Sequence, residues 1–516
     1  MKKIAIFIII IILACCGIYA LQNVNLSTQE TSKVDLSNLE AQNNIIINNE
    51  TLIENKNINC DKSDINTIMV ENNSTLNISN SFVNKSGDSS NNGDDNDFYG
   101  TNSAILVKKD SFANITNIDI TTNSTGSNAI FVTNGESNEN SQQQDTNEDN
   151  KADNSQNGQP PEMPENGLAG KSQDANQPPQ EPNQPENPQK DNQNQNSMSP
   201  NQPNEDSSNG NASANVENVI INTYKDKSRG LDATYNGKIT AKNVVINTRG
   251  GSCAAVATDR GEGSIEVQDS QLNTGVENGS GKGSPCIYST GNITVSKSNG
   301  TAYKSQIACI EGKNSITLND CDLHCFGLGN REDNGEYVDY GGVFIYQSMS
   351  GDADIGTATF NATNSKLSVN ESSDYCTKVP MFHITNTNAI INIENCELSF
   401  ASNILLNISG QNQWGTNGNN GGNLEFNSIG EELNGNIVVD NISSLNFSMK
   451  NSGYNGSINP NETYGSTNII IDSSSTWTLT GNSHISSLEN NGEIIYGNYS
   501  LFINGTEYNS TNPFNK

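Results

Sequence analysis

Short stretches in which apolar and polar residues alternate recur along most of the chain. In "GKNSITLNDCDL", which begins at Gly312, polar residues separate the apolar Ile316, Leu318 and Leu323. The related stretches are "GKITAKNVVI" from Gly237, "GSIEVQDSQL" from Gly263, "GNITVSKSNG" from Gly291 and "AIINIENCEL" from Ala389. A period of two residues is typical of a strand with one buried side, so the pattern predicts many short β-strands.

A short apolar run marks the repeat. It reads "AILV" around Ile105, "AIFV" around Ile130, "GLDA" at Leu231, "AAVA" at Val256, "CIYS" at Ile287 and "CIEG" at Ile310. The interval from Ile105 to Ile130 equals that from Leu231 to Val256, and the next two intervals are similar, so the unit is about 25 residues long. Three short strands per unit and no helical pattern predict an all-β fold, a right-handed parallel β-helix whose coils stack about 4.8 Å apart. Asn and Asp suit its tight turns because they tolerate left-handed backbone.

Residues 136–212 interrupt this pattern. They hold ten of the fourteen prolines, fourteen acidic residues against three lysines, and no aromatic residue. Such a segment buries too little apolar surface to offset its ordering entropy, so we expect it to be disordered. Leaving this segment out shortens the interval from Ile130 to Leu231 to about one repeat unit, which favours an insertion into one coil over a linker between domains.

Four segments follow from these patterns. We predict a signal peptide or membrane anchor at 1–21, an N-terminal cap with the first coils at 22–135, the disordered insertion at 136–212, and the main β-helix with its C-terminal coils at 213–516.

The charge and the cysteine content limit the partners and the scaffold. The 58 acidic and 27 basic residues give a net charge of −31, which disfavours nucleic acid and anionic lipid as partners. Only 32% of the residues are hydrophobic, low for one compact globule but suited to a thin, turn-rich fold. Beyond Cys15 and Cys16 the chain has eight cysteines, too few for a disulfide scaffold.

The N-terminus predicts export. Lys2 and Lys3 precede an apolar run, and "ILAC" ends at Cys15 in the manner of a lipoprotein cleavage box, with Cys15 as the lipidated residue. Two alternatives stay open: cleavage after the "IYA" that ends at Ala20, and an uncleaved membrane anchor that runs from Ile4 to Leu21.

Two stretches carry a resemblance to known families. "STWTLTGNSHISSLENNGEI", with Trp477, Gly481 and Gly492, resembles the C-terminal coils of autotransporter passenger domains. The run from Ser284 to Gly505, with "SPCIYSTGNITV", "VFIYQSMSGDADIGTATF" and "GNIVVDNIS", is similar to adhesin-like surface β-helix proteins of gut bacteria and archaea. The resemblance implies surface exposure and adhesion, without a defined ligand. Unlike autotransporters, the chain is expected to have no membrane barrel after Lys516.

Catalytic motifs are absent from the sequence. It has no HExxH, GxSxG, Walker loop, or GxGxxG in a strand–helix context. "CDLHC", from Cys321 to Cys325, could hold a metal but on a strand is better explained by core packing. Cys286 and Cys309 both precede a marker isoleucine, which predicts that they stack in one column of small buried side chains. A disulfide between them, strained by the parallel stacking, is the alternative.

Charged residues at corresponding turns are candidates for a binding site. Aligning the marker runs places Asp259 and Arg260 near Glu311 and Lys313, either as a polar stripe or as ordinary charged turns. Lyases of this fold use arginine with calcium-binding aspartates, and glycosidases use paired carboxylates.

A second set of candidates lies in "MSGDADIG" and the long loops. Asp352 and Asp354 have a spacing that suits paired carboxylates and also solvent-facing acids. We expect exposed aromatic rings in or beside long loops, which suit sugar rings or protein partners, although ordinary loop packing is the alternative. These aromatic residues are Tyr337, Tyr340, Tyr346 and Trp414.

The sequence therefore predicts an exported, adhesin-like β-helix protein held at the cell surface. It would bind a glycan or the surface of a host or partner cell, act as a monomer, and touch the membrane only through its N-terminus. A β-helix polysaccharide lyase or glycoside hydrolase acting on acidic glycans is one alternative, and a structural envelope protein is another. No catalytic residue, cofactor or metal ligand is predicted, and a structural Ca²⁺ ion is left open.

Overall fold

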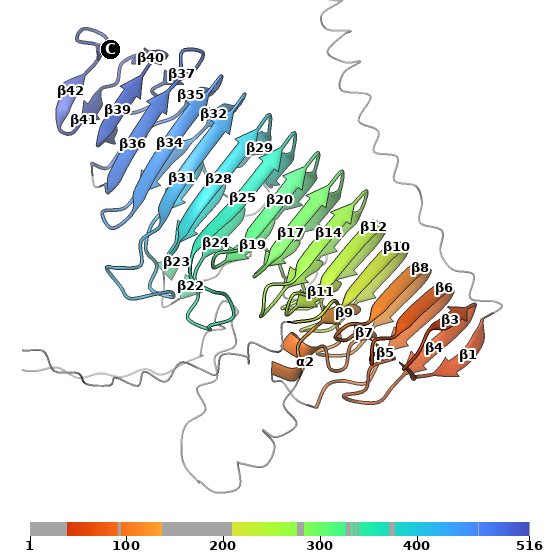
Figure 1. Cartoon of the computed structure of the whole chain (residues 1–516). Coiled ribbons are helices and arrows are strands. Elements are labelled where there is room, and N and C mark those ends of the chain that lie inside the picture. The colour runs from red at the N-terminus through yellow and green to blue at the C-terminus, as the bar shows by residue number, and fades with distance from the viewer. Residues whose placement is uncertain are drawn as a thin grey trace, which may run out of the picture.

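The chain is a stack of β-coils (Figure 1). The computed structural model describes residues 39–90, 94–136, 209–275, 283–326, 332–333, 336–337, 340–370, 377–462 and 464–514. Strands make up 53% of the structure and helix 1%, and the long sheets are parallel, which confirms the predicted all-β parallel β-helix. Within the described ranges no helix is long and apolar enough to cross a membrane; the predicted leader at 1–21 lies outside them.

The largest sheet has 21 strands, and every pairing within it is parallel. Its strands are β1 (Glu40–Asn43), β3 (Thr51–Glu54), β4 (Lys56–Cys60), β6 (Thr75–Lys85), β8 (Phe112–Thr122), β10 (Ser213–Thr223), β12 (Lys238–Thr248), β14 (Ser264–Gln268), β15 (Gln271–Thr274), β17 (Asn292–Ser296), β18 (Asn299–Ala302), β20 (Ser315–Asn319), β21 (Asp322–Cys325), β25 (Thr357–Thr363), β26 (Lys366–Val369), β28 (Asn388–Glu394), β29 (Glu397–Ser399), β31 (Asn423–Ile429), β34 (Ser444–Lys450), β36 (Ser466–Ile471) and β39 (Ser487–Asn490).

A second parallel sheet of 12 strands completes the coils. Its strands are β2 (Ile45–Ile47), β5 (Ile68–Val70), β7 (Ile105–Val107), β9 (Ile130–Thr133), β11 (Leu231–Thr234), β13 (Val256–Thr258), β16 (Ile287–Ser289), β19 (Ala308–Glu311), β24 (Val343–Tyr346), β27 (Phe382–Thr385), β30 (Ile404–Ile408) and β33 (Asn436–Val439). These strands contain the apolar marker runs.

Three small sheets and one short helix complete the described structure. They are the four-stranded sheet of β32 (Glu432–Asn434), β35 (Gly453–Asn455), β37 (Thr476–Thr478) and β40 (Glu493–Ile495), the three-stranded sheet of β38 (Ser483–Ile485), β41 (Leu501–Ile503) and β42 (Thr506–Tyr508), the pair β22 (Glu332–Asp333) and β23 (Glu336–Tyr337), and α2 (Asp94–Tyr99).

One residue at the same corner of successive coils has left-handed backbone, with φ from 48° to 67°. The strand pairing stacks these residues, and we call them the corner column. Its members are Asn55, Asn80, Asn117, Asn218, Asn243, Asp269, Lys297, Asp320, Asn364, Asn395, Gly430 and Asn451. Asn dominates because its short polar side chain tolerates this conformation, as the sequence predicted for the turns.

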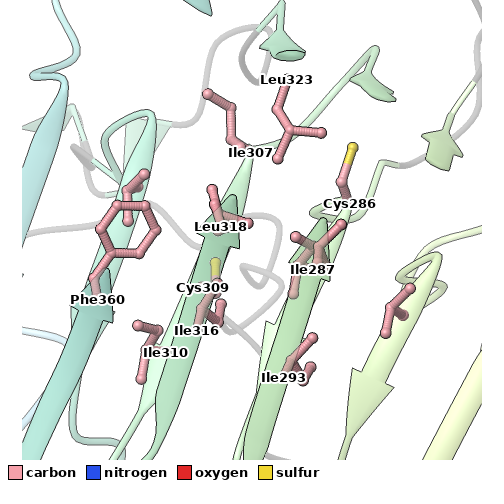
Figure 2. Close-up of a cluster of buried hydrophobic side chains, with 14 of the residues drawn as sticks. Cys286, Ile287, Ile293, Ile307, Cys309, Ile310, Ile316, Leu318, Leu323 and Phe360 are labelled. Carbon is pink, nitrogen blue, oxygen red and sulfur yellow. The ribbon is translucent and has the colours of Figure 1, made fainter. Parts of the chain in front are cut away.

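Inside the coils, apolar side chains stack in register. Ile265 pairs with Ile293, Ile293 with Ile316, and Ile316 with Phe360, and all are buried. Figure 2 shows Ile293, Ile316 and Phe360 on neighbouring strands of this stack. Burying such a side chain contributes about 1.5–3 kcal/mol, so the repeated column provides the main cohesion between coils.

The predicted stacking of Cys286 on Cys309 is wrong. Ile287 pairs with Ala308 rather than with Ile310, and Cys309 pairs with Tyr288, so the predicted alignment of these coils is shifted. The error arises because an alternating pattern looks the same after a shift of two positions. Both thiols are buried and neither is in a disulfide, so the burial was predicted correctly although the shared column was not. Cys321 and Cys325 also lie buried in the hydrophobic core without a disulfide, which confirms core packing for that pair.

The predicted insertion begins and ends within one continuous ladder. Its residues 137–208 lie outside the described residues. On either side of it, Phe112 of β8 pairs with Ser213 of β10, and Ile130 of β9 pairs with Leu231 of β11. The Asn134 Oδ1 accepts a hydrogen bond from the backbone N–H of Ala212 at 2.8 Å, so the two ends lie side by side. Ala212 is buried, and the coil therefore resumes before the predicted boundary.

The residues that directly follow the corner residues form a second, mostly buried column, in which serine is the most frequent residue. The hydroxyl groups of Ser270 and Ser298 each accept a hydrogen bond from the backbone N–H of the residue in the preceding coil. Glu431 takes the same place in a later coil, where its Oε1 accepts from Cys396 N–H at 2.8 Å. Its Oε2 is buried without a hydrogen-bond partner, and burial raises the pKa of this carboxyl to about 7.

Valine at a corner position is predicted to destabilise the fold. Asn80→Val places a β-branched side chain in left-handed backbone, so the free energy of unfolding should fall by about 1–2 kcal/mol. Asn84→Val is the matched control, because Asn84 lies in the same strand, β6, within extended backbone. Urea unfolding midpoints compare the two variants; an equal loss in both would contradict a special role for the corner.

Glu431 is predicted to make the stability pH-dependent. The folded chain holds a proton on this carboxyl between the ordinary pKa of 4.5 and about 7, where the unfolded chain has released it. The free energy of unfolding should therefore fall as the pH rises through this window. Glu431→Gln removes the titration, so the decline between about pH 5 and about pH 8 should be smaller in this variant. Parallel pH profiles for the two chains would refute the assignment.

Candidate functional site

The 12-stranded sheet is buried on both sides in the middle of the stack. Every residue of β9, β11, β19, β24 and β27 is buried, whereas a β-helix strand ordinarily exposes its outer side. Helix α2, residues 347–356 and residues 409–420 lie over this outer face. The Thr234 hydroxyl of β11 donates a hydrogen bond to the backbone O of Phe98 in α2 at 2.8 Å. The rings of Tyr235 and Tyr99 stack with their centroids 5.5 Å apart.

Arg229 is at the centre of one buried charge cluster under this cover. Its guanidinium lies 2.7 Å from Asp259, 3.1 Å from Asp97 of α2 and 3.5 Å from Asp232 of β11. Buried charges are stable only when they are paired, so Arg229 fixes α2 against the sheet. Burial raises the pKa of Asp232 to about 7 and raises that of Asp259 well above its usual range, despite the nearby guanidinium.

Glu311 is the centre of a second buried cluster. Its Oε2 accepts hydrogen bonds from the hydroxyl groups of Tyr288 at 2.7 Å and Tyr346 at 3.0 Å. Its Oε1 accepts from the hydroxyl groups of Ser348 and, at 3.5 Å, Ser350. Burial raises the pKa of Glu311, and carboxyl groups with raised pKa values are typical of binding and catalytic sites.

Two ion pairs hold residues 347–356 against the same face. Arg260 lies 2.6 Å from Asp352, and Lys313 lies 3.0 Å from Asp354. The predicted stripe of Asp259, Arg260, Glu311 and Lys313 is therefore brought together with Asp352 and Asp354. Asp259 and Glu311 are buried, Arg260 is half-buried and Lys313 is exposed, so the stripe extends from beneath the covering segment to the surface.

The expectation of exposed aromatic rings is wrong for Tyr340, Tyr346 and Trp414. Their exposed fractions are 2%, 2% and 4%. Trp414 packs against Tyr346 and Tyr340 with ring centroids 5.1 and 5.8 Å apart, because residues 409–420 fold back over β24. The side chain of Tyr337 lies outside what the structure describes.

Sequence reasoning missed the roles of Arg229, Asp97, Asp232 and Tyr288. One signal was present: apart from Glu311 in "CIEG", Asp232 in "GLDA" is the only charged residue in the marker runs. Asp97 carried no such signal, because only the fold brings α2 over β11. Within the described ranges, no group of three or more His, Cys, Asp and Glu side chains is arranged to hold a metal ion.

The outer face of the 21-stranded sheet is a different kind of surface, with its polar side chains at least partly exposed. Asn side chains on it form hydrogen-bonded columns across neighbouring coils. We call this surface the amide face. Two of its columns, Asn77–Asn114–Asn215 and Asn361–Asn392–Asn427, lie before the corner column, and Asn222–Asn247–Asn273 lies after it. Within a column the amides donate to one another at 2.8–3.4 Å, and an amide retains further donor and acceptor capacity for a ligand.

Comparison with known proteins finds no protein-family model that matches this chain and no curated protein that matches it significantly.

Proposed function

We propose that the chain is an exported, cell-surface, adhesin-like protein that binds a glycan or the surface of a partner cell through the amide face. The observation that carries the proposal is the set of in-register Asn columns on a continuous parallel sheet. The contact surface thus differs from the loops that the sequence favoured, since their described aromatic rings are buried.

The chemistry of the amide face suits sugar hydroxyl groups. A carboxamide donates and accepts hydrogen bonds, as a sugar hydroxyl does, and serine and threonine on neighbouring positions add more such groups. Examples are Thr317, whose hydroxyl accepts from Asn361, and Ser444, which donates to Asn423. The columns hold these groups in place before a ligand arrives, which lowers the entropy cost of binding.

The charge of the chain supports the same class of partner. A net charge of −31 repels nucleic acid and anionic membrane. A neutral glycan avoids this repulsion, and a repetitive ligand suits a surface that repeats at each coil.

Removing one amide column is predicted to weaken binding. In the triple variant Asn361→Ala, Asn392→Ala and Asn427→Ala, lost hydrogen bonds at about 0.5–1.5 kcal/mol each correspond to at least about a tenfold loss of affinity. The measurement is binding of the purified full chain to a glycan array and to intact cells.

The matched control is Asn434→Ala with Asn455→Ala, which removes an Asn–Asn contact from the four-stranded sheet. This control should bind like the unchanged chain. Equal binding by the triple variant, or no binding of any glycan or cell by the unchanged chain, would contradict the proposal.

We also propose that Cys15 is lipidated and holds the protein at the membrane. The charged start, the apolar run and "ILAC" support this anchor, and lipid offsets the repulsion of an acidic chain from the membrane surface.

Mass spectrometry of the native protein is predicted to find a mature N-terminus at Cys15 that carries lipid. Cys15→Ser should release the protein from the membrane fraction, whereas Cys16→Ser should leave it there. A start at Leu21 would indicate a secreted protein, and an intact Met1 would indicate an uncleaved anchor; either result would refute lipidation.

A further inference from the structure

Residues 348–354, which we call the cover segment, are held on the Glu311 cluster mainly by polar contacts. Ser348 and Ser350 donate to Glu311, and Asp352 and Asp354 pair with Arg260 and Lys313. The large apolar side chains in and beside the segment point the other way: Met349 is 73% exposed and Ile355 is 86% exposed. A permanent cover would be expected to bury such side chains, so apolar burial does not hold this segment closed.

The hydroxyl groups on Glu311 come from two sources. Tyr288 and Tyr346 belong to the sheet and occupy Oε2. Ser348 and Ser350 belong to the cover segment and occupy Oε1. If the segment lifts, the hydroxyl groups of a ligand can replace the two serines, and the number of hydrogen bonds on the carboxyl is conserved.

A second observation points to a polar ligand at this place. Gln347 is buried with 7% exposure, and its Oε1 has no hydrogen-bond partner. This atom lies close to Gly312, because a Cβ on that glycine would be 3.3 Å from it. A buried acceptor without a donor costs free energy, and it is available to a ligand hydroxyl beside Glu311.

We infer that the cover segment is a lid, and that the surface beneath it, formed by Tyr288, Glu311, Tyr346 and Gln347, binds a sugar unit of a glycan. Carboxyl, carboxamide and phenol groups together recognise the hydroxyl groups of a sugar. The carboxyl groups of Asp259 and Asp352 lie near enough to raise the pKa of their neighbours and line the same region. This site is separate from the amide face, so each of the two proposals can be correct without the other.

The test uses a full-length unlatched variant, Asp352→Asn with Asp354→Asn, which removes both ion pairs of the cover segment. Hydrogen exchange of the amides in residues 347–356 should become at least about tenfold faster, because the lid opens more often. Short oligosaccharides of galacturonate, glucose and N-acetylglucosamine are the probes. At least one of them should bind the unlatched variant about tenfold more tightly than the unchanged chain, because the competent state is more populated.

Two controls separate this site from other effects. Glu397→Gln breaks the Lys366–Glu397 pair, whose side-chain exposures of 42% and 68% match the 41% and 67% of Lys313 and Asp354. It should change neither exchange at 347–356 nor binding. Tyr288→Phe in the unlatched variant removes one phenol hydroxyl with little change of shape and should weaken the gained binding.

Faster exchange together with tighter binding that Tyr288→Phe reverses supports the inference. Unchanged exchange would show that the segment is no lid. Faster exchange without binding of any probe, or binding that is indifferent to Tyr288→Phe, would show that no sugar site lies beneath it. The Asn361, Asn392 and Asn427 triple variant should keep this binding, so failure of the amide face is distinguishable from failure of the lid site.

Discussion

The left-handed backbone of the corner column is the constraint on which the rest of the structure depends. In each coil from Asn55 to Asn451 one residue with positive φ turns the chain at the same corner. Left-handed backbone is unfavourable for most side chains, and most members are therefore Asn, Asp or Gly. Since the corner recurs in register, the strands before and after it also stay in register, and the apolar columns of the core can form. The same register aligns the Asn side chains of the amide face.

The two large sheets differ in how the polar groups on their outer sides find hydrogen-bond or charge partners. The 21-stranded sheet satisfies its outer polar groups laterally, as Asn392 does by bonding to Asn361 in one coil and to Asn427 in the next. The 12-stranded sheet carries Asp232 and Glu311 on its covered outer side, and buried acids need partners. Arg229 and the tyrosine hydroxyl groups provide those partners. Consequently one face is open and repetitive, while the middle of the other is closed and differs from coil to coil.

The sequence was sufficient for the fold because a period of two within a period of about 25 survives in nearly every coil. It also placed Asp259 and Glu311 near one another, since Asp259 follows the marker run "AAVA" and Glu311 lies within the marker run "CIEG" of the same sheet. The sequence did not predict the burial of site residues where that burial depends on segments outside the repeat. Burial of Tyr346 and Trp414 depends on how residues 409–420 fold back, and no periodicity encodes that path. The wrong register predicted for Cys309 shows what the repeat alone cannot specify. Alternation of apolar and polar residues fixes which side of a strand is buried, but not how the strand aligns with its neighbour.

Stability in a stacked fold is the sum of local terms between neighbouring coils, so one segment can move while the stack stays intact. Cohesion between coils comes from the inward columns, such as the one through Ile293, Ile316 and Phe360. The cover segment contributes almost nothing to these columns, because its contacts are with Glu311, Arg260 and Lys313 on the outer side. Opening it therefore breaks polar contacts that water can replace, while the apolar core and the corner column remain unchanged. A rigid repetitive surface and a movable closed site are compatible in one chain because they depend on opposite sides of the coil wall.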